Sequence, residues 1–122
     1  MIEKWKSLTK QAQCCFHHQN YRQSITLNRQ ALENAQQVFP DYFADDPDDA
    51  VAMMLVSYLN LIDNYEAIND RLVCENLFDQ SFAFFQQCNP PEDSGPHHCV
   101  LMRGLNMWQK ARYEYLHRIP LS

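Results

Sequence analysis

Apolar residues recur every three or four positions along most of the chain, which is the spacing of helices that bury one face. The first such segment covers about residues 2–18, and its apolar face consists of Trp5, Leu8, Ala12, Cys15 and Phe16. The second covers about residues 21–38. Only Gln19 and Asn20 separate the two, so the pattern predicts antiparallel neighbouring helices joined by a very short turn.

The second helix carries a stripe with small residues in its middle, which lets two helix backbones approach closely. The stripe comprises Ser24, Ile25, Asn28, Ala31, Leu32, Ala35 and Phe39. Pro40 follows directly, and a proline disfavours helical backbone in the residue before it and lacks the N–H that the helix needs. We therefore expect this helix to stop near Phe39.

Five aspartates lie between residues 41 and 49. A calcium loop needs a glycine in its bend, and this segment has none. Asp46 and Pro47 have the residue types of an N-cap and a first helical position, and the next two aspartates suit the positive end of the helix dipole. We interpret the segment as the start of a third helix rather than as a metal site.

Three more helices are predicted after this cap. The third runs from Pro47 to about Tyr65 and is apolar almost all round, as expected of a central helix. The fourth covers about residues 70–87, and the fifth about residues 96–118 after a segment rich in proline. Gly104 lies inside the fifth helix, where it indicates close packing against a neighbour.

The two halves of this plan match each other when their turns are aligned, Gln19-Asn20 against Asn69-Asp70. Small and aromatic positions then coincide: Ser24, Asn28 and Ala31 fall opposite Cys74, Phe78 and Ser81. This pattern resembles the tetratricopeptide repeat, a helical hairpin that stacks into a solenoid. The resemblance implies a single all-α domain of five antiparallel helices, with hairpins at about 2–39 and 47–87 and a closing helix at about 96–118. A plain five-helix bundle is the alternative.

The chain departs from that family in several places. Equivalent residues lie 50 positions apart, whereas the family repeats every 34 or so. Ile62 stands where a small residue is expected, and Gln11 and Asn28 stand where large apolar ones are. The first hairpin is therefore the less regular of the two, as terminal repeats are.

Composition narrows the class of partner. The formal net charge of −5 argues against a nucleic-acid binder, and no run of about 18 apolar residues is present to span a membrane. The first residues carry no apolar signal core, so we expect a cytoplasmic protein. Its five cysteines show no framework spacing and are expected to be free thiols, several of them buried.

Candidate chemistry is sparse. Cys88, His97, His98 and Cys99 have zinc-ligand types, but a second pair at ligand spacing is missing. Glu114 and His117 have the spacing of one half of a di-iron site, again without a second copy. No phosphate loop or nucleophile signature occurs. We expect no enzymatic activity and no cofactor; a metal- or redox-responsive bundle built on the His97-His98-Cys99 cluster is the alternative function.

The resemblance implies a groove lined by the first, third and fifth helices. The residues expected to bind a partner there are Lys6, Lys10, Gln13, His17, Asn60, Asp63 and Arg103. The sequence thus predicts a non-catalytic protein–protein interaction module, adaptor or chaperone-like, that holds a peptide or helix of unknown identity in this groove. Apolar faces left at the ends of a short stack make a homodimer a further expectation.

Overall fold

The computed structural model describes residues 2–88 and 96–119 of the chain. They form five helices: α1 (Glu3–His17), α2 (Tyr21–Asp45), α3 (Pro47–Ala67), α4 (Arg71–Cys88) and α5 (Pro96–Arg118). No strand occurs within the described residues. The prediction of an all-α fold with five helices is confirmed. None of the described helices combines the length and apolar character needed to cross a bilayer.

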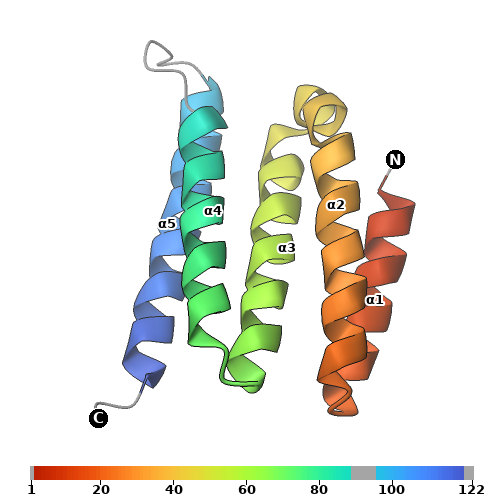
Figure 1. Ribbon diagram of the computed structural model, residues 1–122. Coiled ribbons are helices and arrows are strands. Elements are labelled where there is room, and N and C mark those ends of the chain that lie inside the picture. Colours follow the sequence, from red (N-terminus) through yellow and green to blue (C-terminus); the bar gives the residue numbers. More distant parts are fainter. Residues whose placement is uncertain (1, 89–95, 120–122) are drawn as a thin grey trace.

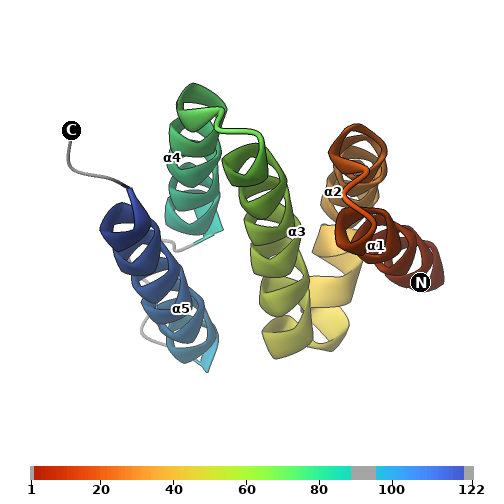
Figure 2. The same ribbon diagram turned by 90° about the horizontal axis from the view of Figure 1, so that it is seen from below.

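The helices stand in an open row. Contacts join α1 to α2, α2 to α3, and α3, α4 and α5 to one another. In Figure 1 the row begins with α1 at one end and finishes with α5 at the other. Seen from below, α2 and α4 lie in one layer, while α1, α3 and α5 lie in the other (Figure 2). Helix α3 is therefore the central element, as its apolar composition predicts.

The two turns predicted to be equivalent have the same hydrogen bonds. Gln19 and Asn69 both adopt a left-handed backbone with φ of 61°. The N–H of Asn20 donates to the carbonyl of Cys15 at 2.8 Å, and that of Asp70 donates to the carbonyl of Tyr65 at 2.9 Å. Both turns are Schellman motifs, which satisfy the last carbonyls of one helix before the next begins.

The following helices also begin alike. The Asn20 side chain caps α2 by accepting a hydrogen bond from the N–H of Gln23 at 3.4 Å, and Asp70 caps α4 by accepting one from the N–H of Val73 at 3.3 Å. Asp46 caps α3 in the same manner, accepting from the N–H of Asp49 at 3.3 Å. These side chains satisfy N–H groups that the helix itself leaves unpaired.

The expected end of α2 near Phe39 is wrong. The helix continues through Pro40 to Asp45, and Figure 1 shows its last part turning away from the axis of the rest. Such a bend accommodates the proline ring and the hydrogen bond it cannot donate. Packing offsets this cost, because the rings of Phe39 and Phe84 meet at 4.9 Å between centroids and Phe43 packs on the same cluster. The first hairpin thus extends beyond residue 39.

Gly104 lies where α5 crosses α3 and α4. A methyl group on its Cα would lie 2.7 Å from Cγ1 of Val51 and 3.4 Å from Cε1 of Phe85. Carbon atoms in contact normally lie at about 3.5–4.0 Å. The close packing that the sequence predicts at this glycine is confirmed.

Candidate binding groove

A groove of about 390 Å³ runs between α1 and α3, with α2 as its floor. We call it the first groove. Its walls comprise Thr9, Ala12, Gln13, Phe16 and His17 from α1 and Val56, Asn60, Asp63 and Asn64 from α3, and its floor comprises Ser24 and Asn28. These spacings of three and four residues place each set on one side of its helix.

A chain of hydrogen bonds fixes the floor. The hydroxyl of Ser24 donates to the carbonyl of Ala12 at 2.8 Å, and the amide of Asn64 donates to that hydroxyl oxygen at 2.9 Å. The Asn28 amide donates in turn to Oδ1 of Asn64 at 2.6 Å. Ser24, Asn28 and Asn64 are all buried. Three helices are therefore tied together directly beneath the groove, where bonded buried polar groups add rigidity.

One wall residue has an unused polar atom. The hydroxyl oxygen of Thr9 is buried and has no hydrogen-bond partner among the described residues. Buried hydroxyl groups are normally bonded, and leaving one unpaired costs free energy. Thr9 therefore has a hydrogen-bonding group beside the first groove that the described residues leave unused.

A second groove of about 170 Å³ lies between α3 and α5, with Phe78 of α4 at its floor. Its other lining residues are Leu59, Ile62, Asp63, Ala111, Glu114 and Arg118. Asp63 lines both grooves, so they meet at the exposed side of α3. The layer formed by α1, α3 and α5 thus carries two adjoining grooves.

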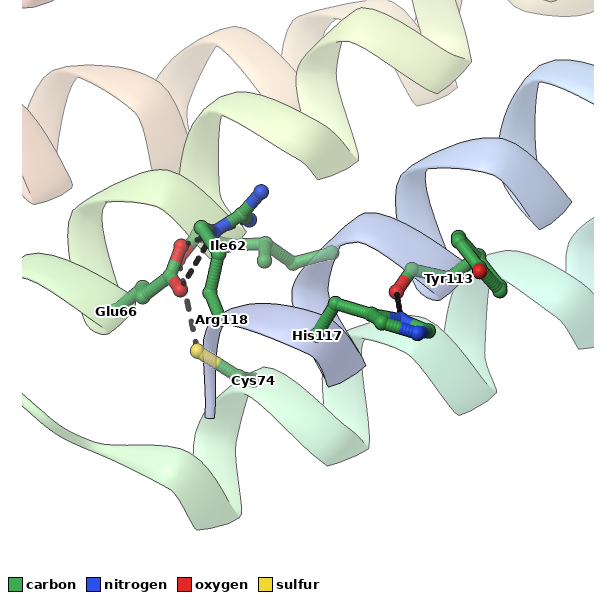
Figure 3. A network of polar contacts seen from close by, with 6 residues as sticks. All are labelled: Ile62, Glu66, Cys74, Tyr113, His117 and Arg118. Atoms are coloured by element: carbon green, nitrogen blue, oxygen red, sulfur yellow. Dashed lines mark hydrogen bonds and ion pairs between the residues drawn. The ribbon is translucent and has the colours of Figure 1, made fainter. Parts of the chain in front are cut away.

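The electrostatics at this junction are dominated by carboxylates. Partial burial and the nearby Glu66 raise the pKa of the Asp63 carboxyl, and Arg118 opposes them. Two hydrogen bonds of 3.0 Å join the Arg118 guanidinium to Glu66 (Figure 3). Since that cation is bound to another acid, it leaves Asp63 without an ion pair of its own among the described residues.

The structure brings together four of the seven residues predicted to bind a partner. Gln13 and His17 lie on one wall of the first groove, and Asn60 and Asp63 lie on the other. The remaining three lie elsewhere. Lys6 lines a separate hollow of about 220 Å³ beside Trp5, Lys10 is exposed outside these hollows, and Arg103 pairs with Asp48 at 2.5 Å.

Sequence reasoning missed the buried polar floor. In the repeat pattern Asn28 is a departure, yet its amide bonds to Asn64. The available signal was a pair of polar residues, Ser24 and Asn28, within an otherwise apolar stripe. Polar residues at core positions indicate a bonded partner, but the sequence does not say which one.

Of the candidate metal ligands Cys88, His97, His98 and Cys99, the side chain of His97 lies outside the described residues. Among the described side chains, no group of three His, Cys, Asp or Glu residues is placed to hold a metal ion. Burial raises the pKa of the Cys88 thiol, and Cys99 is exposed. The described part thus gives no geometry for a site at Cys88, His98 and Cys99.

All five cysteines are free thiols, as expected from their spacing. The expectation that several are buried is wrong, because only Cys74 is buried while Cys14 and Cys99 are exposed. The Cys74 thiol donates to the carbonyl of Ile62 at 3.5 Å (Figure 3). Fifty residues earlier, the hydroxyl of Ser24 donates to the carbonyl of Ala12 in the same way. Cys74 thus has the same place in the second helical pair as Ser24 has in the first.

Comparison with known proteins gives a family for most of the chain. Residues 3–93, which include α1 to α4 and all of the first groove, match the family described as protein of unknown function (DUF2753). No curated protein and no solved structure matches the chain. Because the family match extends over well more than half of its length, the protein belongs to the DUF2753 family.

Proposed function

We propose that this protein is a non-catalytic interaction module, adaptor or chaperone-like, that binds a peptide segment of a partner protein. The observation that carries the proposal is the pair of grooves on α1, α3 and α5 that meet at Asp63. Together they offer a continuous lining of apolar and polar side chains on one layer of the molecule. Peptide-binding grooves between helices have this combination of apolar anchors and a few orienting polar groups.

The floor of the first groove supports this role. A groove that is already held open loses less free energy on binding than one that must be ordered first. The bonds among Ser24, Asn28 and Asn64 hold α2 against α1 and α3 without the partner.

The repeated plan of the chain supports the same reading. Two turns and two caps recur 50 residues apart, as do the contacts of Ser24 and Cys74. Proteins built from stacked helical hairpins commonly present a groove for binding. We include the likeness to tetratricopeptide repeats in the proposal on this basis.

Site-specific photo-crosslinking tests the proposal. A benzophenone amino acid replaces Gln13, which lines the first groove, or Gln30, which is exposed on α2 outside it. We expect proteins from a lysate of the source organism to crosslink at position 13 and not at position 30. The same experiment is repeated with Val56→Arg, which fills the groove, and with Leu72→Arg, which adds the same charge on an exposed part of α4.

Crosslinks at position 13 should disappear with Val56→Arg and persist with Leu72→Arg. Equal crosslinking from positions 13 and 30, or crosslinks that survive Val56→Arg, would count against the groove as the binding surface.

A further inference from the structure

We propose that the segment bound in these grooves places a basic side chain, preferably arginine, against the carboxylate of Asp63. This inference rests on the proposed function and specifies the chemistry of the partner. It is carried by the position of Asp63 at the junction of the two grooves and by the charges around it.

The charge around the junction is negative. Asp63 and Glu114 both line the second groove, and Glu66 lies one turn of α3 beyond Asp63. The cation that lines this groove is Arg118, whose guanidinium is bonded to Glu66. Three carboxylates against one guanidinium leave an excess of acid, which favours a cationic occupant and disfavours an acidic one.

Asp63 is available for such a contact. It accepts no hydrogen bond from the described residues and is exposed, whereas the polar groups of the floor are already bonded to one another. Although the residue reaches solvent, the groups around it desolvate its carboxylate in part, and the Arg118 guanidinium near it is bonded to Glu66. A cation from a bound segment would therefore give Asp63 an ion pair that it lacks in the free protein.

The surroundings favour arginine over lysine. Asn60 lies nearly one helical turn before Asp63 on the same side of α3, and Gln13 lies on the opposite wall. A guanidinium has five donors in a planar fork and can reach more than one acceptor at once, which an ammonium does less well. Both grooves also provide apolar surface for the neighbouring side chains of the bound segment. This surface comes from Phe16 and Val56 in the first groove and from Leu59 and Ala111 in the second.

Fluorescence polarisation with defined peptide pools tests this inference. Each pool contains labelled 12-residue peptides with blocked termini and one fixed central residue, which is Arg, Lys, Gln or Glu, among randomised uncharged positions. The pools are titrated with the wild type, with Asp63→Asn and with Asp79→Asn. Asp79 is an exposed residue of α4 that lines neither groove, so its variant controls for net charge.

We expect the Arg pool to bind about tenfold more tightly than the Gln pool, and the Glu pool to bind weakest, since a charge-assisted hydrogen bond gives roughly this factor. Asp63→Asn should remove the preference for Arg, and Asp79→Asn should retain it. Circular dichroism should show both variants folded, because each change is isosteric and on the surface.

The outcomes separate this inference from the proposed function. Equal binding of all four pools, or a preference for Arg that survives Asp63→Asn, overturns the inference and leaves peptide binding intact. No binding by any pool overturns both. Light scattering shows whether the wild type is a dimer. If it is, and if Asp63→Asn dissociates it, a second copy of this chain occupies the groove, and the inference is overturned.

Discussion

The side-chain amide of Asn28 donates a 2.6 Å hydrogen bond to Oδ1 of Asn64, across the interface between α2 and α3. Both residues are buried, and Asn64 continues the chain of bonds to Ser24. Removing either side chain leaves the amide of the other buried without this partner. This pair therefore ties the shape of the groove to the stability of the fold.

We expect Asn64→Ala to destabilise the protein by about 1–3 kcal/mol, because it leaves the amide of Asn28 buried without an acceptor. Thermal and urea unfolding followed by circular dichroism measure the effect. Asn60→Ala is the matched control, since Asn60 lies on the rim and should change stability by less than about 0.5 kcal/mol. Equal losses for the two variants would contradict the role given to the buried pair.

We expect Gly104→Ala to destabilise the protein, although alanine is favoured over glycine in a helix by about 1 kcal/mol. The new methyl group would lie 2.7 Å from Val51, and overpacking of this kind costs about 1–3 kcal/mol. The loss should be smaller when Val51→Ala makes room. A double-mutant cycle on unfolding free energies checks this, and strict additivity of the two changes would refute the proposed clash.

We expect the raised pKa of Tyr115 to lower the free energy of unfolding in alkali. Burial, with Cys74 and nearby acids, raises the pKa of its hydroxyl from 10.0 to about 12. The unfolded chain then loses this proton first, so the free energy of unfolding falls as pH rises from about 10 towards 12. Urea titrations at pH 7 and across that range should show a shallower fall for Tyr115→Phe than for the wild type. Parallel curves would contradict the prediction.

Tyr115→Phe should also be tolerated at pH 7. The hydroxyl of Tyr115 lies near the Cys74 thiol but meets the geometry of a hydrogen bond with no described group, so its removal costs at most a weak contact with sulfur. A large loss at neutral pH would mean that this hydroxyl is bonded.

The cysteines should differ in reactivity. Burial raises the pKa of the Cys74 thiol, while Cys14 and Cys99 are exposed. Because the thiolate is the reactive form, iodoacetamide should modify Cys14 and Cys99 first and spare Cys74 in the folded protein. Peptide mapping by mass spectrometry gives the order, and a sample unfolded in guanidinium should lose it. Early modification of Cys74 in buffer would contradict the burial described here.

Local signals predicted the helices well where they act within a few residues. Asp46 caps α3 as its residue type indicates, and the two short turns lie where the sequence places them, at Gln19-Asn20 and Asn69-Asp70. Pro40 shows the limit of such rules. Its local preference is to end a helix, but the packing of Phe39 and Phe43 outweighs it. That packing depends on Phe84, which lies 45 residues away in the chain.

The candidate site was predictable on its rim and not on its floor. The resemblance to tetratricopeptide repeats points to seven residues, of which Gln13, His17, Asn60 and Asp63 line the first groove and the other three do not. The pairing of Asn28 with Asn64, and of Arg103 with Asp48, joins residues on different helices. No spacing rule links such residues, so only the packed structure reveals them.

The open row of helices has a kinetic consequence. Most contacts between helices join neighbours in the sequence, with the packing of α5 on α3 as the exception, and folds rich in local contacts form quickly, within microseconds to milliseconds. Helix α1 ends the row and is tied to α3 by the 2.8 Å bond from Trp5 to Ser57. We expect its amide hydrogens to exchange ahead of those of α3. If α1 detaches before the other helices unfold, the first groove opens along one side. A bulky partner segment could then enter the groove sideways.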